Sequence, residues 1–255
     1  MENKFIIVSN PRSGSTWLTS LFGEIPGTFT DYEFKWRPQY EAQPIHQVFD
    51  TGTDSIENRI ASISGNHQNV GSKLVLDHRF HSNEELIELS KIFSNDLKIV
   101  HLIRDLRQVF ISIIRGQFIN KLSDRSGFRD NKVMLKSMKN TSNAVEETRE
   151  ARIIERGHCM RLLRNLVKND IALSKMRCQF NNYFQIQYSD INEGFPLLLK
   201  NLSINAEGFD LDSLLASPPV IKMPSKKETD VVVNIDELED IIELFSDLRQ
   251  QAIEV

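Results

Sequence analysis

A short segment near the N-terminus, residues 9–17 with the sequence SNPRSGSTW, concentrates groups that can bind an anion. It follows an apolar run and precedes helical spacing, so we expect it to turn from a strand into a helix. The first N–H groups of a helix have no partner within it, and the helix dipole favours an anion there. Gly14 allows close approach of the backbone, and Arg12 adds a fixed charge. Hydroxyl donors come from Ser13, Ser15 and Thr16.

The segment differs from the common G-x-x-x-x-G-K-S/T phosphate loop, because Ser15 stands at the lysine position and the first glycine is absent. A capped strand-to-helix turn without a ligand is the alternative interpretation. The density of hydroxyl and guanidinium groups around one glycine favours a phosphate-binding loop.

A second segment, residues 100–107 with the sequence VHLIRDLR, places Arg104 at the end of another predicted strand. Ser112 follows about two turns into the next predicted helix. Arginine offers a planar fork of donors that suits a phosphate, and a serine hydroxyl can add another donor. A surface ion pair of Arg104 with Asp105 or another neighbouring residue is the alternative role for this arginine.

Together the two segments resemble the sulfotransferases that use 3′-phosphoadenosine 5′-phosphosulfate (PAPS). The resemblance implies that residues 12–17 bind the 5′-phosphosulfate and that Arg104 and Ser112 bind the 3′-phosphate. Leu106 stands where the family usually has proline, which is helpful at a helix start but replaceable. The product would be adenosine 3′,5′-bisphosphate (PAP), and no metal would be required.

Two aromatic residues have a nucleotide-binding and a packing interpretation. The sequence IQYSDI at residues 186–191 resembles the family's Tyr-Glu-Asp-Leu element, with Ser189 in place of glutamate. Tyr188 would then border the nucleotide, or only pack the end of a strand. The resemblance places Trp17 near the adenine, and its alternative role is core packing.

The base that accepts the acceptor's proton is expected in another segment. Glu33, beside the apolar Phe34, is the first candidate, because the family's carbohydrate branch has a catalytic glutamate after the first helix. A solvated surface carboxylate is the alternative role of Glu33. His78 is the second candidate, and Lys73 before it would polarise the sulfuryl group or simply end a strand. The sequence is most similar to the bacterial carbohydrate branch of trehalose and nodulation-factor sulfotransferases. The family's C-terminal Arg-Lys-Gly element is not evident, and Lys222, Lys226 and Lys227 are candidates to replace it.

The acceptor stays open between two classes of small molecule. Asp31, Glu33 and Asp77 are expected to edge its pocket. Carboxylates suit the hydroxyl groups of a sugar, and they suit a cationic, nitrogen-rich natural product at least as well. Two other functions remain as alternatives: a small-molecule kinase or nucleotide hydrolase with a degenerate loop, and a nucleotide-binding protein without catalysis.

The pattern of elements predicts an α/β fold with a P-loop-like central parallel sheet and helices on both faces. Strands are expected at residues 4–9, 70–77, 97–103 and 183–188. Helices are expected at residues 16–22, 83–93, 105–114, 190–202 and 235–253. The basic segment 115–170 is interpreted as a helical cap, residues 216–234 as an irregular loop, and residues 1–255 as one domain.

Composition excludes several other classes of protein. The net charge of −4 argues against a globally basic nucleic-acid binder. Cys159 and Cys178 are too few for a disulfide scaffold or a thiolate zinc site, and the six histidines lack metal-site spacing. The sequence has no apolar run long enough to predict a membrane span, and its two cysteines suit a reducing compartment. We therefore expect a cytoplasmic protein. The oligomeric state stays open, a homodimer included.

Overall fold

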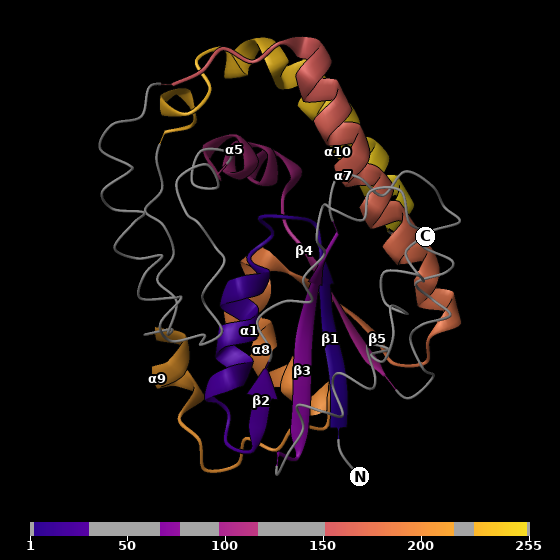
Figure 1. Ribbon diagram of the computed structural model, residues 1–255, viewed down its shortest axis with the longest axis vertical. Helices are drawn as coiled ribbons and strands as arrows, with labels where there is room; N and C mark the ends of the chain where they lie inside the picture. Colours follow the sequence, from indigo (N-terminus) through magenta and orange to yellow (C-terminus); the bar gives the residue numbers. More distant parts are fainter. Residues whose placement is uncertain (1–2, 31–66, 77–96, 117–150, 217–226, 254–255) are drawn as a thin grey trace, which may run out of the picture.

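A single parallel sheet organises the part of the chain that the computed structural model describes, namely residues 3–30, 67–76, 97–116, 151–216 and 227–253. Its strands are β1 (Asn3–Ser9), β2 (Thr28–Thr30), β3 (Asn69–Val75), β4 (Lys98–Ile103) and β5 (Tyr183–Gln187). They lie in the order β2-β3-β1-β4-β5, and every neighbouring pair is parallel (Figure 1). Because β1 pairs in parallel with both β3 and β4, the carboxyl ends of these three strands lie at one edge of the sheet, where α/β proteins bind ligands.

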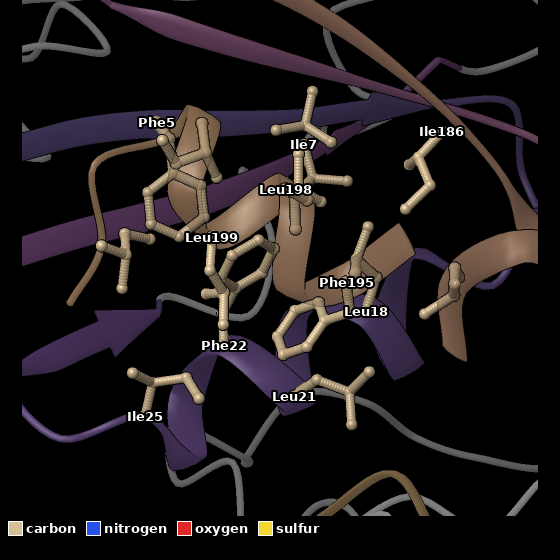
Figure 2. Close-up of a cluster of buried hydrophobic side chains, with 14 of the residues drawn as sticks. Phe5, Ile7, Leu18, Leu21, Phe22, Ile25, Ile186, Phe195, Leu198 and Leu199 are labelled. Atoms are coloured by element: carbon tan, nitrogen blue, oxygen red, sulfur yellow. The ribbon is translucent and has the colours of Figure 1, made fainter. Parts of the chain in front are cut away.

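One face of the sheet is covered by helices α1 (Ser15–Glu24) and α8 (Ile191–Asn201), with α9 (Leu211–Ala216) beside them (Figure 1). Successive side chains of a strand point to opposite faces, so Phe5 and Ile7 of β1 share this side. Figure 2 shows them against the apolar faces of α1 and α8, including Phe22 and Phe195. The rings of Phe22 and Phe195 are 5.1 Å apart and meet edge to face. This packing fixes the start of α1 relative to β1.

The opposite face is covered by the C-terminal half of α7 (Arg156–Met176), where Leu173 packs with Ile6 and Val8. A third apolar cluster joins α5 (Leu106–Gly116), the first half of α7 and α10 (Glu239–Ile253). These three helices extend beyond the carboxyl edge of the sheet, as Figure 1 shows. The predicted sheet with helices on both faces is therefore confirmed.

The four predicted strands and the helices around them are present with small shifts at their ends. Strand β2 and helix α9 were not predicted, and the expected helix at 235–253 begins as a 3-10 turn, Ile235–Leu238. Within the predicted helical cap, residues 151–155 are not helical, and Arg152 forms an isolated parallel bridge with Val232. The helix expected at 83–93 lies outside the described residues.

Candidate active site

The loop between β1 and α1 has a backbone that few residue types accept readily. Arg12 has a φ of 64° and Gly14 a φ of 92°, so both adopt the left-handed region. Gly14 is the N-cap of α1 and has no side chain with which to cap the helix. The first N–H groups of α1 therefore face the loop rather than a capping side chain, as expected for an anion site.

Ser13 lies inside this loop and is 1% exposed. Its Oγ has no hydrogen-bond partner among the described residues. An unpaired buried hydroxyl is costly, so this donor suits an oxygen-rich ligand. Ser15 is also buried, and Thr16 is half-buried at the start of α1.

The two predicted anion-binding segments are in direct contact. The Arg12 Nε donates a hydrogen bond to the Ser112 Oγ at 3.4 Å. The Arg104 Nη1 donates to the backbone carbonyl of Arg12 at 3.0 Å. The structure thus brings Arg12, Arg104 and Ser112 together at the carboxyl edge of β1 and β4.

Arg104 is not engaged by Asp105, because the Asp105 Oδ1 accepts from the Gln108 backbone N–H at 2.9 Å near the start of α5. Instead the Arg104 Nε donates to the Gln108 Oε1 at 3.2 Å. Its guanidinium lies over the Tyr188 ring, 4.4 Å from the ring centroid, which is a cation–π geometry. The predicted alternative, an ion pair between Arg104 and Asp105, is therefore not what holds this arginine.

Tyr188 joins the loop to the end of β5. Its ring lies 5.5 Å from the ring of Trp17, in an edge arrangement. A Cβ atom at Gly14 would overlap the Tyr188 ring, so only glycine allows this approach. Burial raises the pKa of the Tyr188 phenol, and the nearby Arg104 charge opposes this only in part. Tyr188 is therefore a neutral, half-buried side chain beside the loop.

Lys73 brings a second cation to the start of α1. It lies on β3, opposite Ile7 in the sheet register, and is 2% exposed. Its Nζ donates to the Thr16 Oγ1 at 2.8 Å. A buried ammonium group needs compensating contacts, and here one of them is a hydroxyl of the loop.

Several predicted site residues lie outside the described residues. These are Asp31, Glu33, Asp77, His78, Lys222 and Lys226. Lys227 is described and exposed, and the carboxylate of its neighbour Glu228 pairs with Arg107 at 2.6 Å. Arg107 also pairs with Glu239, so it ties α5 to the first residue of α10 as well as to Glu228.

Sequence analysis missed the residues that hold the loop from behind. The buried Asn10 donates to the Leu166 carbonyl at 3.0 Å and accepts from the Asn169 Nδ2 at 2.9 Å. Asn169 belongs to the buried side of α7, where an amide among apolar neighbours is the signal that could have identified it. Helix α7 therefore anchors the first residue after β1.

Within the described ranges, the histidine, cysteine, aspartate and glutamate side chains form no group of three or more that could hold a metal ion. Among the described helices, none is long and apolar enough to cross a membrane.

Comparison with known proteins gives a family and a fold. A crystal structure of a sulfotransferase from Alicyclobacillus acidocaldarius aligns with a TM-score of 0.55 at 12% identity, covering 100% of this chain and 96% of that one. Sulfotransferases from Mycobacterium avium (TM-score 0.48, 12% identity, 96% and 76% covered) and from mouse in complex with PAP (0.45, 13%, 100% and 89%) align less closely. No curated protein sequence matches the chain significantly.

The first alignment supports the same fold, a central parallel sheet flanked by helices. The model of the sulfotransferase domain matches residues 2–192, a span that contains β1 to β5 and every predicted anion-binding residue. The chain therefore belongs to the sulfotransferase family and is an enzyme of sulfuryl transfer.

Proposed function

We propose that the enzyme takes its sulfuryl group from PAPS and transfers it to a hydroxyl or amine of a small-molecule acceptor. The contact of Arg12 with both Ser112 and Arg104 carries this proposal. PAPS has two anionic ends, the 5′-phosphosulfate and the 3′-phosphate. A strand-to-helix loop beside an arginine–serine pair offers donors for both ends in one site.

The residues present fit such a donor. The unpaired Ser13 Oγ and the loop N–H groups can hold the phosphosulfate, together with Ser15 and Thr16. Arg104 and Ser112 can hold the 3′-phosphate. We expect Tyr188 and Trp17, whose rings lie 5.5 Å apart, to border the adenine.

The loop and its neighbouring cations act on the leaving side of the transfer. When bound, PAPS supplies the sulfuryl group, and PAP is the product released. Arg12 and the loop N–H groups stabilise the negative charge that develops on the leaving side. Lys73 adds a buried positive charge next to Thr16.

A base on the acceptor side takes the acceptor's proton. Glu33 is the first candidate and His78 the second. For the acceptor we propose a sugar, as in the bacterial carbohydrate branch, or a cationic, nitrogen-rich natural product. Asp31, Glu33 and Asp77 are the carboxylates that would contact either one.

Titration calorimetry with PAP, adenosine 5′-monophosphate (AMP) and ATP tests the donor. We expect PAP to bind tightest, and Arg104→Ala to weaken PAP about ten- to a hundredfold while changing AMP little. An equal loss for both nucleotides would reject the role of Arg104. A preference for ATP would favour phosphoryl transfer instead.

Mass spectrometry then tests turnover and identifies the acceptor. The purified enzyme is incubated with PAPS and a metabolite extract, and products are expected to gain one SO₃ unit. Tight binding of PAP without any such product would favour a nucleotide-binding protein that has lost catalysis.

A further inference from the structure

A cluster of buried polar side chains connects β4, α7 and α10 to Arg104. His101 of β4 and Asp170 of α7 are both 0% exposed, and Arg249 of α10 is 7% exposed. The His101 Nε2 lies 3.2 Å from the Asp170 Oδ1, and the His101 Nδ1 lies 2.8 Å from the Tyr183 hydroxyl. Four elements of the fold therefore meet in one polar cluster.

Arg249 connects this cluster to the site. Its Nε lies 2.7 Å from the Asp170 Oδ2, an ion pair without hydrogen-bond alignment. Its Nη1 donates to the backbone carbonyl of Arg104 at 2.7 Å. One guanidinium thus holds both a buried carboxylate and the residue whose side chain contacts the loop carbonyl of Arg12.

The position of Asp170 strengthens this link. The preceding residue, Asn169, donates to Asn10 at the start of the loop. Two consecutive residues of α7 therefore connect to the two anion-binding segments, one directly and one through Arg249. Helices α7 and α10 run side by side in Figure 1, and their apolar side chains share one cluster.

A buried ion pair is weak evidence for stability, because the cost of desolvating two charges can match their attraction. An apolar pair of similar volume would serve packing alone at least as well. The Arg249 guanidinium does more than pack, because it lies against the Asp170 carboxylate and at the same time donates from Nη1 to the Arg104 carbonyl.

We propose that Arg249 is a positioning residue that fixes Arg104 at the end of β4 and thereby sets the preference of the enzyme for nucleotides with a 3′-phosphate. The inference rests on the proposed function, since it requires Arg104 to bind that phosphate. Arg249 lies beyond residues 2–192, the span that the sulfotransferase-domain model matches. In this proposal α10 completes the 3′-phosphate site through Arg249, without itself contacting the phosphate.

The test compares Arg249→Lys with a matched control, Arg156→Lys. Lysine keeps the charge beside Asp170 but lacks the fork that also reaches the Arg104 carbonyl. Arg156 likewise joins α7 to α10, through an exposed pair with Asp240 at 2.5 Å, and has no contact with Arg104. Both variants are titrated with PAP and with AMP, and their melting temperatures are recorded.

Arg249→Lys is expected to weaken PAP roughly three- to thirtyfold while AMP changes less than about twofold. Arg156→Lys is expected to leave both affinities unchanged. Equal weakening of PAP and AMP by Arg249→Lys would show a merely structural role and overturn the proposal. An unchanged PAP affinity would overturn it as well.

A double variant covers the case in which Arg249→Lys does not fold. Asp170→Asn with Arg249→Met removes both charges together, so that no single buried charge is left unpaired. It is expected to lose the preference for PAP over AMP, and retention of the wild-type preference would overturn the proposal. If Arg104→Ala leaves the preference for PAP over AMP unchanged, the proposed role of Arg104 is wrong. If Arg104→Ala loses this preference and the Arg249 variants keep it, only the proposed role of Arg249 is wrong.

Discussion

The side chain of Arg104 donates a hydrogen bond to the backbone carbonyl of Arg12 at 3.0 Å, across 92 residues of sequence. Two arginines that follow different strands are thus placed by one another. The Arg12 side chain in turn reaches Ser112, on the helix that follows Arg104. Each of the two anion-binding segments therefore depends on the geometry of the other.

Arg12→Ala is expected to lower kcat more than it lowers donor affinity. Negative charge builds on the leaving side only as the sulfuryl group transfers, so a cation there stabilises the transition state more than the bound donor. We expect a loss of about 10²–10³ in kcat, the usual effect of removing one such donor. Steady-state kinetics and PAP titration measure the two effects separately. A variant with normal kcat and only a raised donor KM would contradict this role.

Gly14→Ala is expected to impair nucleotide binding through two effects on one residue. A left-handed backbone costs an L-residue about 1–2 kcal/mol, and the new Cβ would also overlap the Tyr188 ring. Gly208→Ala is the matched control, because Gly208 has a φ of 76° with no atom within 4 Å of the added Cβ. PAP titration and thermal unfolding should show the larger loss for Gly14→Ala. Equal melting temperatures and unchanged PAP affinity in both variants would contradict a tight contact between the loop and Tyr188.

Lys73→Met is expected to lower kcat about tenfold or more while the protein stays folded, since methionine keeps most of the buried stem and removes the charge. Lys98→Met is the control, because Lys98 begins β4 at the other end of the sheet and donates to the Leu202 carbonyl. Because Lys98 lies at the amino end of β4, away from the anion-binding segments, its loss should leave turnover unchanged. Kinetics and urea unfolding of the two variants measure this contrast. The same kcat in Lys73→Met and wild type would remove Lys73 from the transfer site.

The strands and the anion-binding segments could be predicted because their signals are local. β1 and β4 are largely apolar runs, and each is followed by residues with phosphate-binding chemistry, Arg12 after β1 and Arg104 after β4. Strand β2 was missed because it has three residues, Thr28–Thr30, and exists through its pairing with β3. No periodicity can develop over so short a segment.

The buried polar cluster could not be predicted, because its contacts join distant residues. His101 and Asp170 are 69 residues apart, and Arg249 reaches Arg104 across 145 residues. The sequence of α7 does indicate that Asp170 is unusual, because helical spacing puts it on the same face as Leu163, Leu166 and Val167. A charged residue on an apolar face indicates a partner, but it does not identify which residue that partner is.

Stability is expected to fall above pH 9 because of Cys159. Burial raises the pKa of this fully buried thiol from 9.0 to about 11, so the folded protein keeps a proton that the unfolded chain releases. Unfolding then releases a proton between these two pH values, and the free energy of unfolding decreases as pH rises through that window. Urea unfolding at pH 8 and 9.8 should show a smaller decrease for Cys159→Ala. Identical decreases in the variant and the wild type would contradict the raised pKa.

The remaining prediction concerns the base on the acceptor side. If Glu33 takes the acceptor's proton, Glu33→Gln should bind PAP normally and lose on the order of 10²–10⁴ in kcat, because the amide cannot accept that proton. His78→Ala should then have a milder effect. Both variants are compared by PAP titration and by single-turnover transfer to the acceptor identified by mass spectrometry.

The ranking of the two variants decides the assignment when both bind PAP as tightly as the wild type does. A larger loss in His78→Ala would transfer the role of base to His78. Two mild variants would place the base in a different segment. A loss of PAP affinity in Glu33→Gln would instead show that Glu33 supports the donor. The pH dependence of kcat adds an independent check. With a carboxylate base, kcat rises as the pH passes through the pKa of that carboxylate, and this rise should be absent in Glu33→Gln.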